Sequence, residues 1–405
     1  MNLKTLLIPV SMFVVLYSYA QQAPTSKFGK GILNLIDKDS TWSMKIGARM
    51  QFLALADKSL ETTSESMSSF SVRRARLKFD GFAFSPKLRY KLELGLSNND
   101  MSGANEFTSN APRYIYDAVL KWNFYKNFEL WFGQTKLPGN RERVISSGDM
   151  QLVDRSLLNS NFNIDRDLGI QIRHYFKLSQ NFIVKEVLAI SQGEGRNVTK
   201  GNIGGYQYTT RLELLPLGNF TTKKGDYKGG DLAREPKPKI AFGVTYDFNH
   251  DAVKTRSNMG GYMKNDVGFY HTNISTLFID TMFKYKGFSF MGEYAYRSAK
   301  DPIAKNSDGS ILLNSNNKPV VVQEGNALNL QSGYLLTNNW EVSGRYTNIN
   351  FNQSIINKKM VNQYTVGLSK YIAGHKLKVQ TDFSYLDALN TASRLLYRLQ
   401  VDIHF

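Results

Sequence analysis

RLLYRLQVDIHF, residues 394–405, ends the chain and decides the fold. Side chains of an extended strand point alternately to opposite faces. One face of this stretch holds Leu395, Tyr397, Leu399, Val401, Ile403 and Phe405, and the other holds Arg394, Leu396, Arg398, Gln400, Asp402 and His404. A strand with one apolar and one mostly charged face fits a wall between lipid and water. We predict that it closes a transmembrane β-barrel, and that the terminal Phe405 belongs to the signal read by the barrel assembly machinery.

The first twenty residues have the composition of an export signal. They contain one charge, Lys4, an apolar run at 6–16, and the small residues Ser18 and Ala20. The run is too short to span a bilayer as a helix and suits cleavage by a signal peptidase. We expect residues 1–20 to be a signal peptide, 21–42 an N-terminal periplasmic segment and 43–405 the barrel, located in the outer membrane of a Gram-negative bacterium.

Composition supports a barrel and excludes several other classes. Aromatic residues make up 13% of the chain, with 22 Tyr and 25 Phe, as the interface girdles of a barrel require. The absence of cysteine removes disulfide and thiolate chemistry. The net charge of +17 is not gathered into a basic run, so we expect no nucleic-acid partner. The five histidines lack ligand spacing, and no nucleophile lies near a base; we expect no metal, no cofactor and no enzymatic activity.

Segments of alternating hydrophobicity recur along the chain at the length that a tilted strand needs to cross a bilayer. The alternation is clear at Leu88, Tyr90, Leu92, Leu94 and Leu96, and weak in segment 181–193. We predict sixteen strands, near 43–56, 69–84, 86–98, 113–125, 127–138, 167–178, 181–193, 205–215, 238–250, 274–287, 288–300, 325–337, 338–351, 361–373, 374–388 and 393–405. Sixteen strands enclose an aqueous lumen.

Short and long connections alternate between these segments, as periplasmic turns and surface loops do in bacterial barrels. Tight turns are predicted at 85–86, 126–127, 179–180, 286–287, 338–339 and 374, and long connections at 57–68, 99–112, 139–166, 194–204, 251–273, 301–324 and 352–360. The stretch 216–237 is long where a short turn is due. It is either a periplasmic excursion or the sign of a miscounted strand.

Two stretches resemble a known family. The first is 29–51, with Gly29, Lys30 and Gly31 leading to KIGARMQ at 45–51; the second is GQTKLP at 133–138, followed by RER at 141–143, DRS at 154–156 and DRDLG at 165–169. Both resemble the phosphate-selective porin O and P family, and the second resembles its Bacteroidetes branch. The resemblance implies a sixteen-stranded barrel, commonly a homotrimer. It also implies that the third outer loop, here 139–166, folds inward to form a constriction, and that anions are guided along a basic wall.

If the apolar faces look at lipid, the lumen receives more bases than acids. A charge on the lipid face costs about 2–4 kcal/mol at the bilayer midplane, so the pattern has an energetic basis. The residues expected to line the pore and guide anions are Lys45, Arg49, Arg74, Arg76, Lys78, Arg89, Arg173, Lys376, Lys378 and Arg398. These side chains either attract anions or simply make the wall of the lumen wettable.

The predicted inward loop is nearly balanced in charge. It holds Arg141, Arg143, Arg155 and Arg166, against Glu142, Asp149, Asp154, Asp165 and Asp167. Neighbours such as Asp154 and Arg155, or Asp165 and Arg166, suit ion pairs that pin a loop to the wall as well as they suit a filter.

Two functions remain open at this stage. The first is a porin for small hydrophilic solutes that prefers anions, possibly phosphate-like ones. The second is an outer-membrane scaffold with an occluded lumen, whose loops 57–68, 251–273 and 301–324 bind another chain.

Overall fold

The computed structural model describes residues 27–61, 66–352, 360–388 and 392–405. Sixteen of its strands form the wall of a barrel, and their bounds overlap all sixteen predicted segments. They are β2 (Trp42–Ser59), β3 (Met67–Ala83), β4 (Ser85–Gly95), β5 (Ile115–Tyr125), β6 (Phe128–Lys136), β7 (Arg166–Lys177), β8 (Ile183–Ser191), β9 (Gln207–Leu215), β10 (Lys239–Ala252), β14 (Thr272–Tyr285), β15 (Phe288–Ala299), β16 (Gly325–Leu335), β17 (Trp340–Phe351), β18 (Val361–Tyr371), β19 (Leu377–Ala388) and β20 (Arg394–His404).

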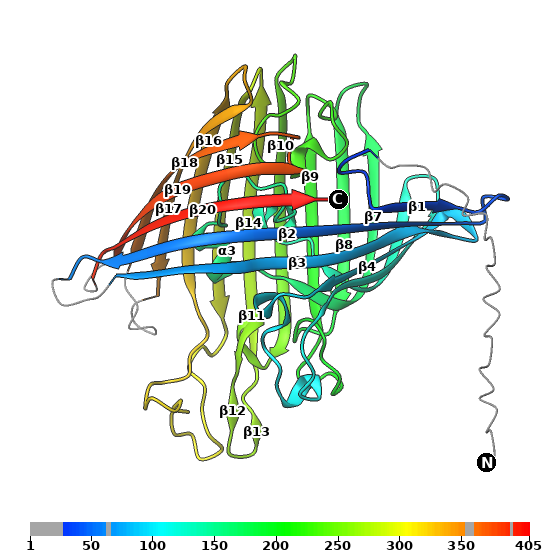
Figure 1. Cartoon of the computed structure of the whole chain (residues 1–405). Helices are drawn as coiled ribbons and strands as arrows, with labels where there is room; N and C mark the ends of the chain where they lie inside the picture. The colour runs from blue at the N-terminus through cyan, green and yellow to red at the C-terminus, as the bar shows by residue number, and fades with distance from the viewer. Residues whose placement is uncertain (1–26, 62–65, 353–359, 389–391) are drawn as a thin grey trace, which may run out of the picture.

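The sheet closes on itself. Each wall strand pairs antiparallel with the next, and β20 returns to pair with β2, from Arg49 opposite His404 to Ser59 opposite Arg394 (Figure 1). The predicted antiparallel sixteen-stranded barrel is therefore confirmed. The signal peptide predicted at 1–20 lies outside the described residues.

Smaller elements lie outside the wall. Strand β1 (Leu33–Ile36) pairs with the start of β2. The others are α1 (Asn98–Met101), η1 (Glu106–Thr108), α2 (Arg141–Val144), α3 (Leu157–Phe162), η2 (Gly225–Tyr227), β11 (Lys254–Tyr262), β12 (Lys264–Asn265) and β13 (Gly268–Phe269). In the part of the chain that the structure describes, no helix is long and apolar enough to cross a membrane.

The wall strands bury their polar face and expose their apolar face. In β20, Arg398 and Asp402 are buried, whereas Tyr397, Leu399 and Val401 are exposed. In a closed sheet the buried face points into the lumen, and the exposed apolar face is left for lipid. This is the alternation predicted from residues 394–405.

Strand β8 departs from this pattern because apolar residues occur on both of its faces. Leu188 and Ile190 are exposed, while Ala189 on the buried face packs in a cluster with Leu137, Leu158 and Phe162. Those three residues belong to the connection between β6 and β7. The inner face of β8 therefore meets protein rather than water, which explains why its sequence does not alternate cleanly.

Short and long connections alternate as predicted, except that the connection between β9 and β10 is long where a short turn is due. The tight turn between β3 and β4 is at Phe84, with a positive φ of 65°, one residue before the predicted position. Strands β9 and β10 pair directly, from Leu214 opposite Phe242 to Gln207 opposite Asn249. The long stretch between them is therefore a real connection at the short-turn end, and no strand was miscounted. At the opposite end, the β12–β13 hairpin and the segment after β15 project beyond the barrel (Figure 1).

Candidate functional site

The connection between β6 and β7, residues 137–165, is called the β6–β7 segment below. It hydrogen-bonds to the buried faces of strands far from its own. The side chain of Gln151 donates to Ser289 of β15 at 3.0 Å and to Glu341 of β17 at 2.7 Å, and the Gln151 carbonyl accepts from Gln380 of β19 at 2.8 Å. Near the other end of the segment, Arg297 of β15 donates to the carbonyl of Asn161 at 3.2 Å. The segment thus contacts buried residues of β15, β17 and β19.

Charged groups hold the β6–β7 segment in place. Arg141 is fully buried and its guanidinium lies 2.7 Å from the carboxylate of Asp280 on β14. Asp154 forms ion pairs with Arg73 of β3 and, at 2.8 Å, with Arg398 of β20. The ammonium of Lys378 on β19 donates to the carbonyl of Met150 at 2.7 Å. Breaking one side of a buried pair costs about 3–5 kcal/mol, so these contacts fix the path of the segment.

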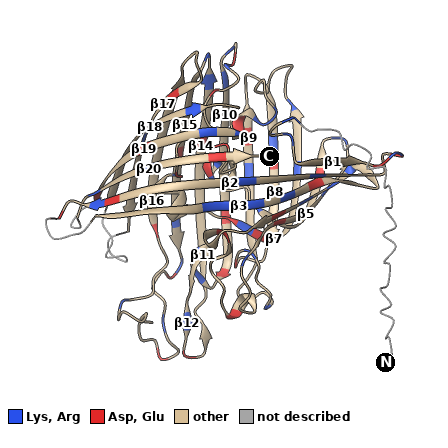
Figure 2. Cartoon of the chain, viewed as in Figure 1, with Lys and Arg blue, Asp and Glu red and all other residues tan. Residues whose placement is uncertain are grey.

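A cavity of about 280 Å³ lies between the β6–β7 segment and the wall strands β3–β7. Basic residues dominate its lining, and Asp100 is its one acid. The lining residues are Arg73, Arg74, Arg76, Asn99, Asp100, Tyr116, Lys136, Arg143, Ser147, Arg155 and Arg166. Figure 2 shows the long basic stretch on β3, which supplies three of them.

The cavity keeps a net positive charge after its ion pairs are formed. Asp100 pairs with Arg76 at 2.8 Å, and Arg166 pairs with Asp117 at 3.1 Å. Three cations form no ion pair within the described ranges: Arg74 donates to the Gln51 amide oxygen at 2.6 Å, and Lys136 and Arg155 donate to backbone carbonyls. Burial lowers the pKa of Arg155 to about 10, which leaves its guanidinium charged at neutral pH.

Arg73 reaches the cavity because of an irregularity in strand pairing. Gln51 lies opposite Arg74, but the next residue, Phe52, lies opposite Val72, so Arg73 is the extra residue of a β-bulge. A bulge breaks the alternation of faces locally and re-aims a side chain. Arg73 was not among the residues predicted to line the pore. Three arginines within four residues, RRAR at 73–76, were the signal available in the sequence.

The family model of the phosphate-selective porin O and P family matches residues 45–395. The chain belongs to this family. An uncharacterized protein of Aquifex aeolicus is 24% identical over 368 residues, which cover 84% of this chain and 82% of that protein.

Solved porins share the fold. The anion-selective porin of Comamonas acidovorans has a TM-score of 0.53 and 10% identity, with 90% of this chain and all of that one covered. OmpF of Salmonella typhi, in complex with daunomycin, has a TM-score of 0.56 and 11% identity over 92% of this chain and all of the other. Family and fold together indicate an outer-membrane channel rather than an enzyme.

Of the basic residues predicted to line the pore of this porin, few reach the cavity. Arg74 and Arg76 line it, whereas Arg49, Lys378 and Arg398 contact the β6–β7 segment or its ion-pair partners. Four others lie on wall strands away from the cavity: Lys45 on β2, Lys78 on β3, Arg89 on β4 and Arg173 on β7. The guanidinium of Arg173 lies 4.0 Å from the centre of the Trp131 ring. Lys376 is exposed in the turn before β19, outside the wall strands.

Of the two neighbour ion pairs suggested by the sequence of the β6–β7 segment, one forms and one does not. Asp154 pairs with arginines of β3 and β20 rather than with its neighbour Arg155. Asp165 pairs with Arg143 and, at 3.5 Å, with Arg166. Because Asp154 and Asp165 are engaged in these contacts, neither pairs with Arg74, Lys136 or Arg155, the three cations of the cavity that lack an acid partner among the described residues.

Proposed function

We propose that this porin conducts small hydrophilic solutes passively and prefers anions, including phosphate-like ones. The observation that carries the proposal is the cavity, where the basic side chains of Arg74, Lys136 and Arg155 have no acid partner among the described residues and Arg155 stays charged. Unpaired positive charge beside a narrow aqueous path lowers the free energy of an entering anion and raises that of a cation. Arg173 on β7, whose guanidinium donates to the Gln171 amide oxygen and forms no ion pair among the described residues, extends this field.

We also propose that the β6–β7 segment is the constriction of the channel. Its hydrogen bonds to buried side chains of β15, β17 and β19 support an inward course, since those side chains face the lumen. A segment along that wall reduces the bore and leaves the passage beside β3–β7. Arg143 and Arg155 then face the solute from the segment, and Arg74 and Arg76 face it from the wall.

Neutralising the cavity is expected to reduce anion preference. The test is the double variant Arg74→Gln, Arg155→Gln. Each lost charge removes about 1 kcal/mol of attraction for an anion at about 4 Å in a water-like medium. For each charge removed, the chloride-to-potassium permeability ratio should therefore fall roughly fivefold. Reversal potentials in a potassium chloride gradient measure this ratio, and added inorganic phosphate tests for block of the chloride current.

The matched control is Lys305→Gln, Lys318→Gln, which removes two exposed charges of the segment after β15. It should leave the ratio unchanged. An equal drop in both double variants would show that net charge, not the cavity, sets the preference.

A scaffold with an occluded lumen is the second candidate. Contacts among the long connections beyond the barrel favour the scaffold. The ring centre of Phe107 lies 3.9 Å from that of Tyr262. The carboxylate of Asp266 accepts a hydrogen bond of 2.9 Å from the backbone N–H of Ser307. Wild-type protein in a planar bilayer discriminates the two candidates. Conductance steps support the porin, and their absence from folded protein supports the scaffold.

We propose that the porin is a homotrimer, as the family resemblance implies. Its apolar outer surface can pack against another copy as well as against lipid, since the side chain of Phe70 on β3 is 90% exposed. Unheated protein in mild detergent should migrate as a trimer after cross-linking. A monomer as the sole cross-linked species would contradict this.

A further inference from the structure

The connection between β9 and β10, residues 216–238, is called the β9–β10 segment below, and it turns into the barrel. Phe220, Asp226, Asp231 and Glu235 are each at most 5% exposed. The buried ammonium of Lys284 on β14 donates to two carbonyls of the segment, those of Gly225 and Lys228, both at 2.9 Å. A connection that merely extended into solvent would leave its polar backbone to water.

The β9–β10 segment meets the β6–β7 segment directly. The backbone N–H of Gly229 donates to the carbonyl of Asp149 at 2.6 Å, and the guanidinium of Arg141 donates to the carbonyl of Asp226 at 3.0 Å. On the other side of this junction, His375 in the turn before β19 lies 3.0 Å from the Gly229 carbonyl. Two connections that start at opposite ends of the barrel are therefore joined inside it.

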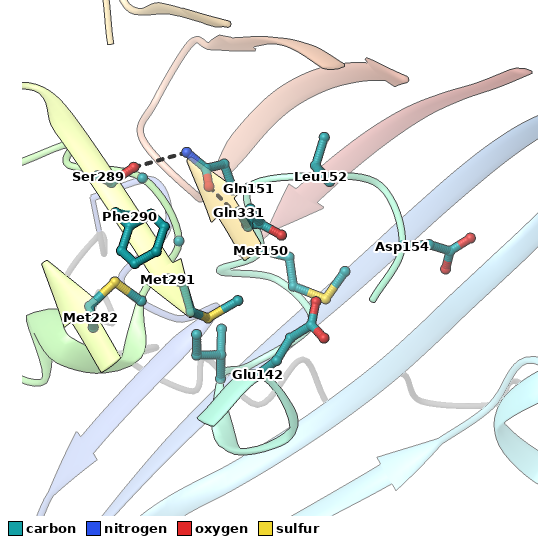
Figure 3. A pocket seen from close by; sticks show the side chains of 13 residues that line it. Glu142, Met150, Gln151, Leu152, Asp154, Met282, Ser289, Phe290, Met291 and Gln331 are labelled. Atoms are coloured by element: carbon teal, nitrogen blue, oxygen red, sulfur yellow. Dashed lines mark hydrogen bonds between the residues drawn. The ribbon is translucent and has the colours of Figure 1, made fainter. Parts of the chain in front are cut away.

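Apolar packing fills the same junction. Phe220 of the β9–β10 segment shares a buried cluster with Ile145 and Met150 of the β6–β7 segment, and with Met282 and Met291 of the wall. The hole that remains has about 20 Å³, room for roughly one water molecule. Figure 3 shows the methionine side chains around it. The basic cavity beside β3–β7, at about 280 Å³, is more than ten times larger.

We propose that the β9–β10 segment is an inner plug. Together with the β6–β7 segment it closes the lumen over β14–β19 from the short-turn end, so that solutes pass only along the β3–β7 wall and through the basic cavity. Selectivity then depends on a connection that contributes no residue to that cavity. The inference rests on the proposed channel function, because it assigns the route by which solutes cross.

Excision of the plug tests the proposal. Residues 218–236 are replaced by Asn-Gly, a pair suited to joining antiparallel strands. The single-channel conductance in potassium chloride is expected to rise about twofold or more, because a sixteen-stranded barrel encloses a wide aqueous lumen once unblocked. The chloride-to-potassium permeability ratio is expected to fall toward one, since the new path bypasses the arginines.

A point variant makes the same test with less disturbance of the fold. In Gly229→Val, a Cβ atom would lie 2.6 Å from the Gln151 backbone nitrogen and 2.8 Å from the Asp149 carbonyl oxygen, so the two segments must separate. The matched control is Lys223→Val, at an exposed position of the same segment. Heat-modifiable migration establishes that each barrel is folded, and Gly229→Val decides the outcome if the excised barrel does not assemble.

The outcomes separate the plug from the channel. The plug is overturned if a folded excision variant, or folded Gly229→Val, has the same conductance and the same chloride-to-potassium permeability ratio as the wild type. The channel proposal still stands in that case if the wild type prefers anions. If the variants show single-channel conductance steps and the wild type shows none, the proposed open channel is overturned and the plug is upheld. Increased conductance in Lys223→Val as well would show that any change in the segment perturbs the barrel, and would overturn the specific role of the junction.

Discussion

Deletion of Phe405 is expected to remove most of the assembled barrel from the outer membrane. The residue is the last of the apolar face of 394–405, which we propose as the signal for the assembly machinery. Protein lacking Phe405 should be found as unfolded, protease-sensitive chain in the periplasm. Heat-modifiable migration and protease resistance of the membrane fraction measure the loss, and normal levels of folded barrel would contradict the prediction.

The contacts of Phe405 are too weak to explain such a loss by stability. Its backbone N–H donates to the Ala48 carbonyl at 2.9 Å, and its ring packs edge-on against Phe28 at 6.2 Å between ring centres. A hydrogen bond contributes about 1 kcal/mol and an aromatic pair about 0.5–1.5 kcal/mol. The paired register of β2 and β20 from Arg49 to Ser59 remains. The same variant should therefore refold in detergent micelles nearly as well as the wild type, which separates recognition from stability.

The strands could be predicted from sequence because lipid and water impose a period of two on the wall. β20 shows this most clearly. The alternation is weak where the wall packs against protein in place of water, although the strand predicted there, β8, is present. On the buried face of β8, Ala189 shares an apolar cluster with Leu158 and Phe162, which explains an apolar residue at that position. No sequence pattern local to β8 reports this contact.

The candidate site was harder to predict than the barrel. The period of two placed Arg74 and Arg76 on the inner face, but Arg73 joins them through a bulge that only the pairing with β2 reveals. The inward course of the β9–β10 segment depends on contacts between residues far apart in sequence, such as Gly229 with Asp149. Its unusual length was visible in the sequence, and its partners were not.

The difference between anchoring and filtering within the β6–β7 segment leads to a paired prediction. Arg141 is fully buried and contacts Asp280 of the wall at 2.7 Å as well as the Asp226 carbonyl at 3.0 Å. Arg141→Ala should release the segment and raise the conductance of chloride and potassium alike. Asp280 keeps the guanidinium of Arg211 at 2.7 Å, so its carboxylate is not left unpaired and the barrel should remain folded.

Arg155→Gln, in contrast to Arg141→Ala, is expected to change selectivity and not the width of the pore. Its guanidinium donates to the carbonyls of Glu142 and Ile145, at 3.1 and 2.8 Å, within the segment itself, and it lines the cavity without an acid partner among the described residues. The variant should lower the permeability ratio and weaken block by phosphate while total conductance stays near the wild-type value. Single-channel conductance with and without inorganic phosphate measures both variants. A wider pore in Arg155→Gln, with selectivity intact, would mean that Arg155 is itself an anchor, because only a residue that holds the segment in place can change the bore when its charge is removed.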